Sequence, residues 1–402
     1  MVSKIVKMAL AYSTLTLPAS LAAEAPLQTE QRELHYIPPI SMADAATGQA
    51  GASLAVFTPS ANPIRHTIDY EIWDYALKQI VISMGPSTRQ AMRRPDHIAG
   101  TRIRQGTQSR YRLEGSVVLY NFFTRDVIAS FTEYREDLER VTNSLDIASL
   151  PRNEQLAFWI NLHNVALLEQ LAKNWPVREP RKMKLDGVPL DEARFITIKG
   201  IPLSLRDIRE EIVFRHWRDP KVIYGFWRGE IGGPQLQSHA FTGDNVASLL
   251  DVAAADYVNS LRGTQKRGEK LEVASLYAEV APFFFPDFEA DLRAHLAKYA
   301  EVPVRQLLDQ TRLVDPSITE TAIADLHGGS RPPNFLFVSS EAGAGDVELV
   351  GWSERLGQAA FEMLQTRNRK LQTMERRGQP TGRVFLSNVP LPEDHPNKDA
   401  VD

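Results

Sequence analysis

One long apolar segment near the middle of the chain constrains the fold more than any other feature. Residues 151–171 read PRNEQLAFWINLHNVALLEQL, and their apolar side chains would cover nearly the whole circumference of a helix. A helix that is apolar all round is buried on most of its sides. We therefore predict a central helix here, with Pro151 in its first turn, around which the rest of the chain packs.

Two asparagines interrupt this apolar segment. Asn161 and Asn164 are three residues apart and share one face of the helix, and Glu154 lies two turns earlier on that face. A buried amide without a hydrogen-bond partner costs about 1–3 kcal/mol, so partners must lie around this face. Either the two amides orient a ligand in a polar pocket, or they bind backbone groups of a neighbouring loop.

A glycine-rich loop follows at residues 228–236, which read RGEIGGPQL. Gly229, Gly232 and Gly233 permit positive φ angles, and we expect them to leave backbone amides exposed. Arg228 places a permanent positive charge beside those amides, which favours binding of an anion.

We predict one ligand site between the central helix and this loop. Its ligand-binding residues are Asn161, Asn164, Arg228, Gly229, Gly232 and Gly233. Such a site suits a small anion or a carboxylate-bearing ligand. The alternative is that Arg228 forms a structural salt bridge with Glu154 or Glu230.

Chemistry in the same cleft would need an acid or a base. The candidates are Glu154, Glu230 and His239, because His239 lies just past the loop and a histidine–carboxylate pair works near neutral pH. Their spacing matches no metal motif, and the chain shows no serine elbow, P-loop or dinucleotide fingerprint. We expect no metal and no other cofactor.

Composition narrows the functional classes. The formal net charge of -4 argues against nucleic acid as the main partner. The chain contains no cysteine, which excludes disulfides, thiol nucleophiles and cysteine metal sites.

Periodicity predicts helices and short strands or hairpins packed around the buried central helix in a single domain. Helical patterns cover residues 70–84 and 119–141, and short β-branched runs separated by glycine cover 184–190 and 193–203. Residues 221–227 are expected to form a further strand.

The chain begins like a secretory protein. Lys4 and Lys7 precede a short apolar run and small residues, which predicts a signal peptide at residues 1–22, cleaved near Ala22. No later run is long enough to span a bilayer, so we expect a soluble protein, periplasmic or secreted. The remaining segments are a linker or loosely packed arm (23–66), the main domain (67–350), a C-terminal helix (351–377) and a tail (378–402).

The string Ala157-Phe-Trp-Ile-Asn-Leu-His-Asn164 resembles the Ala-Phe-Trp-Ile-Asn-Leu-Tyr-Asn signature of the family catalogued as domain of unknown function 547. Supporting pieces at residues 203–208 and 229–236 follow in the family's order, and the resemblance covers residues 68–299. It implies a helix-rich α+β domain and carries no assigned activity.

The departures from the family pattern concern its reactive residues. Many relatives carry cysteine at the positions of Arg228 and Gly233, a Glu-His pair at Arg209-Glu210, and histidine at Ile223. The chain therefore resembles a degenerate member, a possible pseudoenzyme, and we expect a non-catalytic protein that binds a ligand or partner in the cleft. The alternative is a hydrolase or transferase that works without a thiol through the Glu–His pair.

Overall fold

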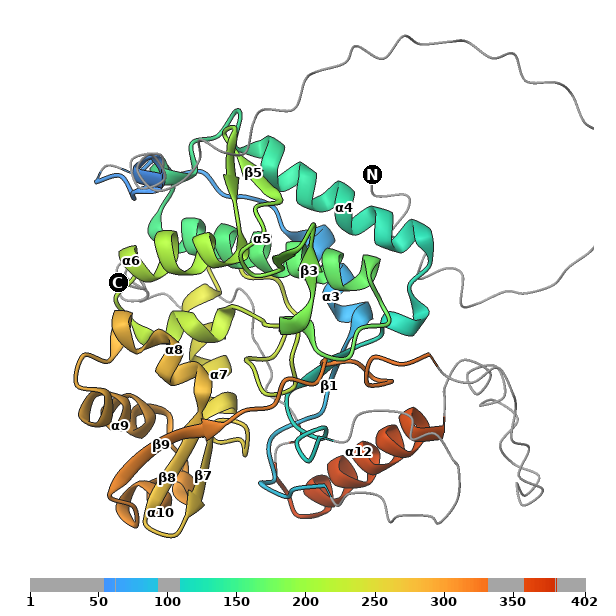
Figure 1. The fold of residues 1–402 in the computed structure, drawn as a ribbon, viewed down its shortest axis with the longest axis vertical. Helices are drawn as coiled ribbons and strands as arrows, with labels where there is room; N and C mark the ends of the chain where they lie inside the picture. Colours follow the sequence, from blue (N-terminus) through green and yellow to red (C-terminus); the bar gives the residue numbers. More distant parts are fainter. Residues whose placement is uncertain (1–53, 62, 93–108, 332–357, 380, 382–402) are drawn as a thin grey trace, which may run out of the picture.

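Helix α5 (Arg152–Lys173) runs through the middle of the molecule (Figure 1). Helices α4 (Arg125–Val141) and α7 (Val246–Val258) and the π-helical segment η5 (Asp207–Val213) pack against it. Every residue from Glu154 to Glu169 is buried, as expected for a helix with apolar side chains on all its faces. The prediction of a buried central helix is confirmed.

The structure is a computed structural model and describes residues 54–61, 63–92, 109–331, 358–379 and 381. Its further helices and short helical turns are η1 (Ala55–Phe57), α3 (Glu71–Ile80), η2 (Tyr120–Phe122), η3 (Ile147–Ser149), η4 (Pro180–Lys182), α6 (Phe214–His216), η6 (Pro220–Gly225), α8 (Ser275–Phe284), α9 (Phe288–Tyr299), α10 (Val302–Asp309) and α12 (Gln358–Arg376). Its strands are β1 (Val81–Ser83), β2 (Ser116–Val118), β3 (Lys184–Leu185), β4 (Val188–Pro189), β5 (Ile196–Ile198), β6 (Ile201–Leu203), β7 (Thr264–Arg267), β8 (Lys270–Ala274) and β9 (Leu313–Ile318).

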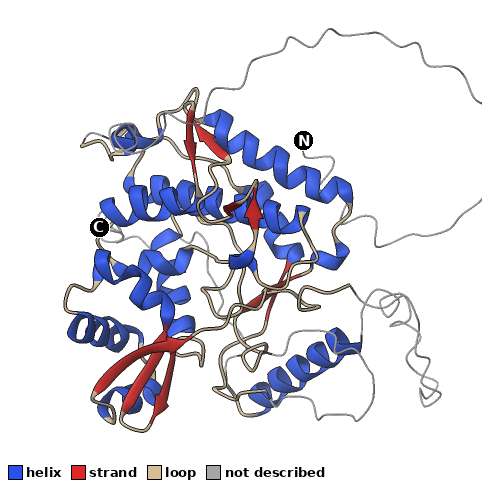
Figure 2. Ribbon diagram, viewed as in Figure 1, coloured by secondary structure: helices blue, strands red, loops and turns tan. Residues whose placement is uncertain are grey.

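The strands form small separate groups among the helices (Figure 2). Strands β1 and β2, β3 and β4, and β5 and β6 form antiparallel pairs. A three-stranded sheet has the order β7-β8-β9, with β8 antiparallel to β7 and parallel to β9. This sheet lies with α9 and α10 at the end of the molecule away from α4 (Figure 1). Small sheets around a buried helix confirm the predicted helix-rich α+β fold.

One predicted strand is wrong. Residues 221–227 were expected to be extended, but they begin within η6, a 3-10 helix. Pro220 fixes φ at the start of this helix, and the Asp219 carboxylate accepts a hydrogen bond from the Lys221 amide at 3.0 Å. A short apolar run fits a buried strand and a buried helical turn equally well, so its pattern alone does not separate them.

The ends of the chain are described only in part. The predicted signal peptide (1–22), most of the predicted arm (23–66) and most of the predicted tail (378–402) lie outside the described residues. The described end of the arm packs on the core, where the rings of Phe57 and Trp159 meet edge to face with centroids 5.2 Å apart. No helix within the described residues combines the length and apolarity needed to cross a membrane.

Candidate functional site

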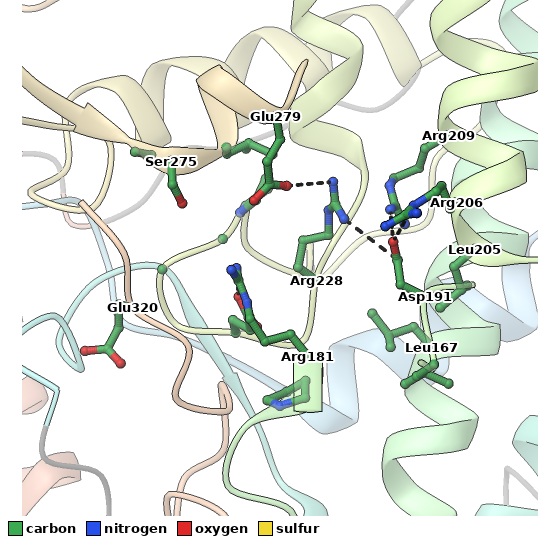
Figure 3. A pocket seen from close by; sticks show the side chains of 18 of the residues that line it. Leu167, Arg181, Asp191, Leu205, Arg206, Arg209, Arg228, Ser275, Glu279 and Glu320 are labelled. Carbon is green, nitrogen blue, oxygen red and sulfur yellow. Dashed lines mark hydrogen bonds and ion pairs between the residues drawn. The ribbon is translucent and has the colours of Figure 1, made fainter. Parts of the chain in front are cut away.

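The glycine-rich loop forms one wall of a cavity of about 260 Å³ (Figure 3). Its other walls come from α5, η4, the end of β4 and the segment after it, η5 and the residues just before it, α7, the β8–α8 junction, and the end of β9 with the residues after it. Four arginines and five carboxylates line it: Arg181, Arg206, Arg209, Arg228, Asp191, Glu192, Glu230, Glu279 and Glu320. Polar and charged groups that converge on a concave space are typical of a ligand site.

Arg228 projects into this cavity between two carboxylates (Figure 3). Its side chain is 18% exposed; Nη1 lies 3.8 Å from an Asp191 oxygen and Nη2 lies 3.6 Å from a Glu279 oxygen. Both separations exceed hydrogen-bond range, so the guanidinium makes ion pairs but no hydrogen bonds with the described residues. Burial, and then the charge of Arg209, lowers the pKa of Arg228 to about 10. Arg228 therefore stays cationic at neutral pH with unused N–H donors.

A chain of hydrogen bonds connects the cavity wall to α5. Arg209 donates from Nη2 to Asp191 Oδ2 at 2.7 Å, and its Nη1 lies 3.0 Å from His163 Nε2. His163 Nδ1 in turn lies 3.0 Å from Asn164 Oδ1. Burial alone would raise the pKa of Asp191, but the charges of Arg209 and Arg228 outweigh it and hold that pKa well below its usual range. Asp191 is therefore an ionised carboxylate in a fixed position.

Close backbone approaches give the glycine-rich loop its shape. Gly229 has a φ of +76°, and a Cβ there would lie 2.6 Å from a leucine side chain of α5. The Gly232 amide donates to the Glu320 carbonyl at 3.1 Å, and the Gly233 amide donates to the Glu230 carbonyl at 3.3 Å. The expectation of exposed amides is therefore wrong for Gly232 and Gly233, because backbone carbonyls already accept from them. Both residues line the cavity, whereas Gly229 does not.

Asn161 and Asn164 hold the two ends of the segment that contains the loop. Asn164 donates to the Gly225 carbonyl at 2.9 Å and accepts from the Trp227 amide at 3.1 Å. Asn161 donates to the Phe241 carbonyl at 2.6 Å and accepts from the amide of the same residue at 3.1 Å. Both side chains are buried, and neither lines the cavity. Their amides bind backbone on either side of the loop rather than residues 228–236 themselves, so they hold the flanking segments and do not bind a ligand in this cavity.

Two of the catalytic candidates, Glu230 and His239, lie apart. Glu230 lines the Arg228 cavity, but both of its carboxylate oxygens accept from Arg181 at 2.6 Å. His239 lines a second cavity, where its Nδ1 lies 3.2 Å from Asp74 Oδ1. No histidine is among the described residues that line the Arg228 cavity.

Glu154, the third candidate, lies near the N-terminal end of α5 and accepts hydrogen bonds from backbone amides. Burial raises the pKa of Glu154, and hydrogen bonds from the amides of Ile68 and Gly243 oppose that rise. Its Oε2 is buried and has no hydrogen-bond partner among the described residues. The ion-pair partners of Arg228 are Asp191 and Glu279, so a salt bridge from Arg228 to Glu154 does not form.

Several residues that line the cavity are not predicted by the sequence. Asp191 follows β4, and Ser275 and Glu279 belong to the first two turns of α8. No motif or spacing connects them with Arg228, because tertiary packing alone brings them together. Arg209 could be recognised as a candidate site residue, since it stands where the family pattern has a different residue. Within the described part of the chain, no group of three or more histidines or carboxylates is arranged to hold a metal.

Part of the chain matches a known protein family. Residues 147–258 match the family model described as "Protein of unknown function, DUF547". The matched region runs from the start of η3 to the end of α7, so it contains α5, η5 and the glycine-rich loop. No curated protein and no solved structure matches the chain.

Proposed function

The chain contains a DUF547 domain at residues 147–258, and we propose that the protein binds a small carboxylate-bearing or other anionic ligand beside Arg228 without transforming it. The proposal rests on the burial, the positive charge and the unused hydrogen-bond donors of Arg228. Its guanidinium is largely buried in a cavity, is cationic, and makes no hydrogen bond with any described residue. A planar set of unused donors suits the two oxygens of a carboxylate or phosphate.

The composition of the cavity favours binding over catalysis. The resemblance to the family pattern implies cysteine at the positions of Arg228 and Gly233, and both of these residues line this cavity. A guanidinium and a glycine supply no nucleophile there. The alternative hydrolase or transferase has less support, because Glu230 pairs with Arg181 and His239 lies with Asp74 in another cavity.

Titration with small anions tests the proposal. Acetate and inorganic phosphate are added to the wild type and to Arg228→Gln, and binding is followed by calorimetry and by the indole NMR signal of Trp227. Arg228→Gln should weaken binding about tenfold to 100-fold, because a hydrogen bond to a charged group contributes about 1.5–3 kcal/mol. Arg194→Gln is the matched control, since Arg194 pairs with Asp207 outside the cavity.

Two results would overturn the proposal. One is that the wild type binds neither of these anions and no larger carboxylate-bearing probe. The other is equal binding to the wild type and Arg228→Gln, which would place the anion elsewhere on the protein.

We also propose that the protein is exported. The basic start at Lys4 and Lys7, the apolar run and the small residues before Ala22 support a cleaved signal peptide. Sequencing the N-terminus of the mature protein from its native host tests this, and an intact Met1 would contradict it.

A further inference from the structure

The Arg228 cavity also contains an acceptor and a hydroxyl that the fold leaves unused. Ser275 and Glu279 are four residues apart on α8, so they share one face of that helix, and both line the cavity (Figure 3). The Glu279 side chain is 46% exposed, and among the described residues it lies at ion-pair distance from Arg228 alone. Within the described residues, neither the Glu279 carboxylate nor the Ser275 hydroxyl takes part in a hydrogen bond.

The cavity therefore offers a cation and an anion side by side. Arg228 Nη2 and a Glu279 oxygen are 3.6 Å apart, too far for a hydrogen bond between them. One ligand can bind both groups at once only if its own negative and positive charges are also adjacent. In an α-amino acid the carboxylate and the ammonium are attached to the same carbon atom, whereas the two charged ends of a longer peptide are separated.

We infer that the ligand of this site is a free α-amino acid with an apolar side chain. This inference rests on the proposed function and names its ligand class. The carboxylate of the amino acid binds Arg228, and its ammonium donates to Glu279 and to the Ser275 hydroxyl. No covalent step is involved.

The charge balance of the cavity favours a zwitterion over a simple anion. Four arginines face five carboxylates, so the lining has no excess of positive charge. A simple anion at Arg228 would also lie close to the carboxylates of Asp191 and Glu279, which repel it. An ammonium on the ligand offsets that repulsion and uses the free acceptor.

The remaining walls of the cavity determine the side chain of the ligand. They carry apolar side chains from several elements: Leu167, Leu190, Leu205, Leu276 and Ile318. The cavity of about 260 Å³ lies just below the range of about 300–1,000 Å³ for sites that hold drug-sized molecules. An aliphatic amino acid fits both the size and the lining.

Three matched probes test the inference on the full-length mature protein by calorimetry. L-leucine carries both charges, 4-methylpentanoate lacks the ammonium, and 3-methylbutylamine lacks the carboxylate. Wild-type protein should bind L-leucine at least about tenfold more tightly than either analogue, since each analogue loses one charge-assisted contact.

Variants at the two charged positions separate this inference from the proposed function. Glu279→Gln should abolish the preference for L-leucine over 4-methylpentanoate while retaining the binding of 4-methylpentanoate. Arg228→Gln should weaken both ligands. Glu289→Gln, an exposed change on α9 outside the cavity, is the matched control and should retain the preference. Far-UV circular dichroism and urea unfolding confirm that each variant is folded.

The outcomes are distinguishable. If 4-methylpentanoate binds as tightly as L-leucine and depends on Arg228, the proposed function stands and the amino-acid inference fails. If Glu279→Gln retains the preference for L-leucine, the inference also fails, and the Arg228–Glu279 pair serves the fold only. If L-leucine, 4-methylpentanoate, acetate and phosphate all fail to bind the wild type, both proposals fail.

Discussion

Arg209 Nη1 lies 3.0 Å from His163 Nε2, and this contact fixes the tautomer of the histidine. An arginine has only donors, so His163 accepts at Nε2 and carries its proton on Nδ1, which donates to Asn164 Oδ1 at 3.0 Å. Burial, and then the charge of Arg209, lowers the pKa of His163 well below its ordinary value. A neutral His163 thus supports Arg209, which in turn holds Asp191 at the cavity wall.

The first prediction concerns the pH dependence of folding. A histidine in the unfolded chain binds a proton with a pKa of about 6.5, whereas the buried ring of His163 resists protonation. Its contribution to the free energy of unfolding is therefore complete above about pH 6.5 and is lost as the pH falls toward the lowered pKa of the folded state. His163→Gln, which does not titrate, should flatten the loss of stability on acidification from neutral pH. Urea titrations at a series of pH values measure this.

His66→Gln serves as the control for that experiment, because His66 is exposed. It should leave the pH dependence of unfolding unchanged. An acid-side slope that is the same in His163→Gln and the wild type would contradict a neutral, buried His163.

The second prediction concerns the asparagine that clamps the chain just before Arg228. Asn164→Ala leaves the Gly225 carbonyl, the Trp227 amide and the His163 ring without their partner. Each orphaned buried group costs about 1–3 kcal/mol, so for three such groups we expect a loss of at least about 3 kcal/mol in the free energy of unfolding. Urea unfolding measures it. Asn174→Ala, which removes an exposed amide at the end of α5, should cost less than about 1 kcal/mol. Equal costs would show that Asn164 is not a clamp.

The third prediction concerns Glu154. Because burial raises its pKa in the folded protein, the stability that Glu154 contributes is present below the unfolded value of about 4.3 and is lost as the pH rises through the folded value. Glu154→Gln keeps an acceptor oxygen for the amides of Ile68 and Gly243 and removes the buried charge. The variant should be more stable than the wild type at pH 7, and this gain should shrink at pH 4. A variant less stable at both pH values would show that the charge itself is needed.

The sequence predicts those parts of the fold that depend on local pattern. The apolar circumference of residues 151–171 predicts α5. Ser204 and Asp207, three residues apart at the start of the η5 segment, form another local pattern, a capping box. In the structure the Ser204 amide donates to Asp207 at 2.9 Å, and the Asp207 amide donates to Ser204 at 3.0 Å. The sequence does not predict η6, because the apolar run at residues 222–227, interrupted only by Gly225, fits either secondary structure.

The candidate site could be predicted only in part. Arg228 was identified because it adjoins a glycine-rich loop, which is a local feature. Asp191 and Glu279, its ion-pair partners, lie far away in sequence, and only the packing of the segment after β4 and of α8 around the loop brings them to it. Polar residues on a buried helix indicate that partners exist, but the sequence does not tell backbone partners from a ligand, as Asn161 and Asn164 illustrate.

The last prediction separates two contributions to the loss of stability when Gly229 is replaced by alanine: backbone strain and crowding by the added Cβ. Gly187 and Gly229 have similar positive φ angles, +84° and +76°, but only Gly229 is crowded. A Cβ at Gly187 would meet nothing within 4 Å, whereas one at Gly229 would lie 2.6 Å from Leu171 Cδ1. Gly187→Ala should therefore lose only the backbone term, about 1 kcal/mol. Gly229→Ala should lose about 2–4 kcal/mol, because overpacking adds about 1–3 kcal/mol.

Gly229→Ala should also weaken acetate binding, because the displaced backbone carries the neighbouring Arg228. Gly187→Ala should leave acetate binding unchanged, since Gly187 lies outside the cavity. Urea unfolding and acetate titration of the two variants provide both measurements. Equal losses of stability would mean that Leu171 moves aside at no cost. Unchanged acetate binding in Gly229→Ala would mean that the loop does not set the position of Arg228.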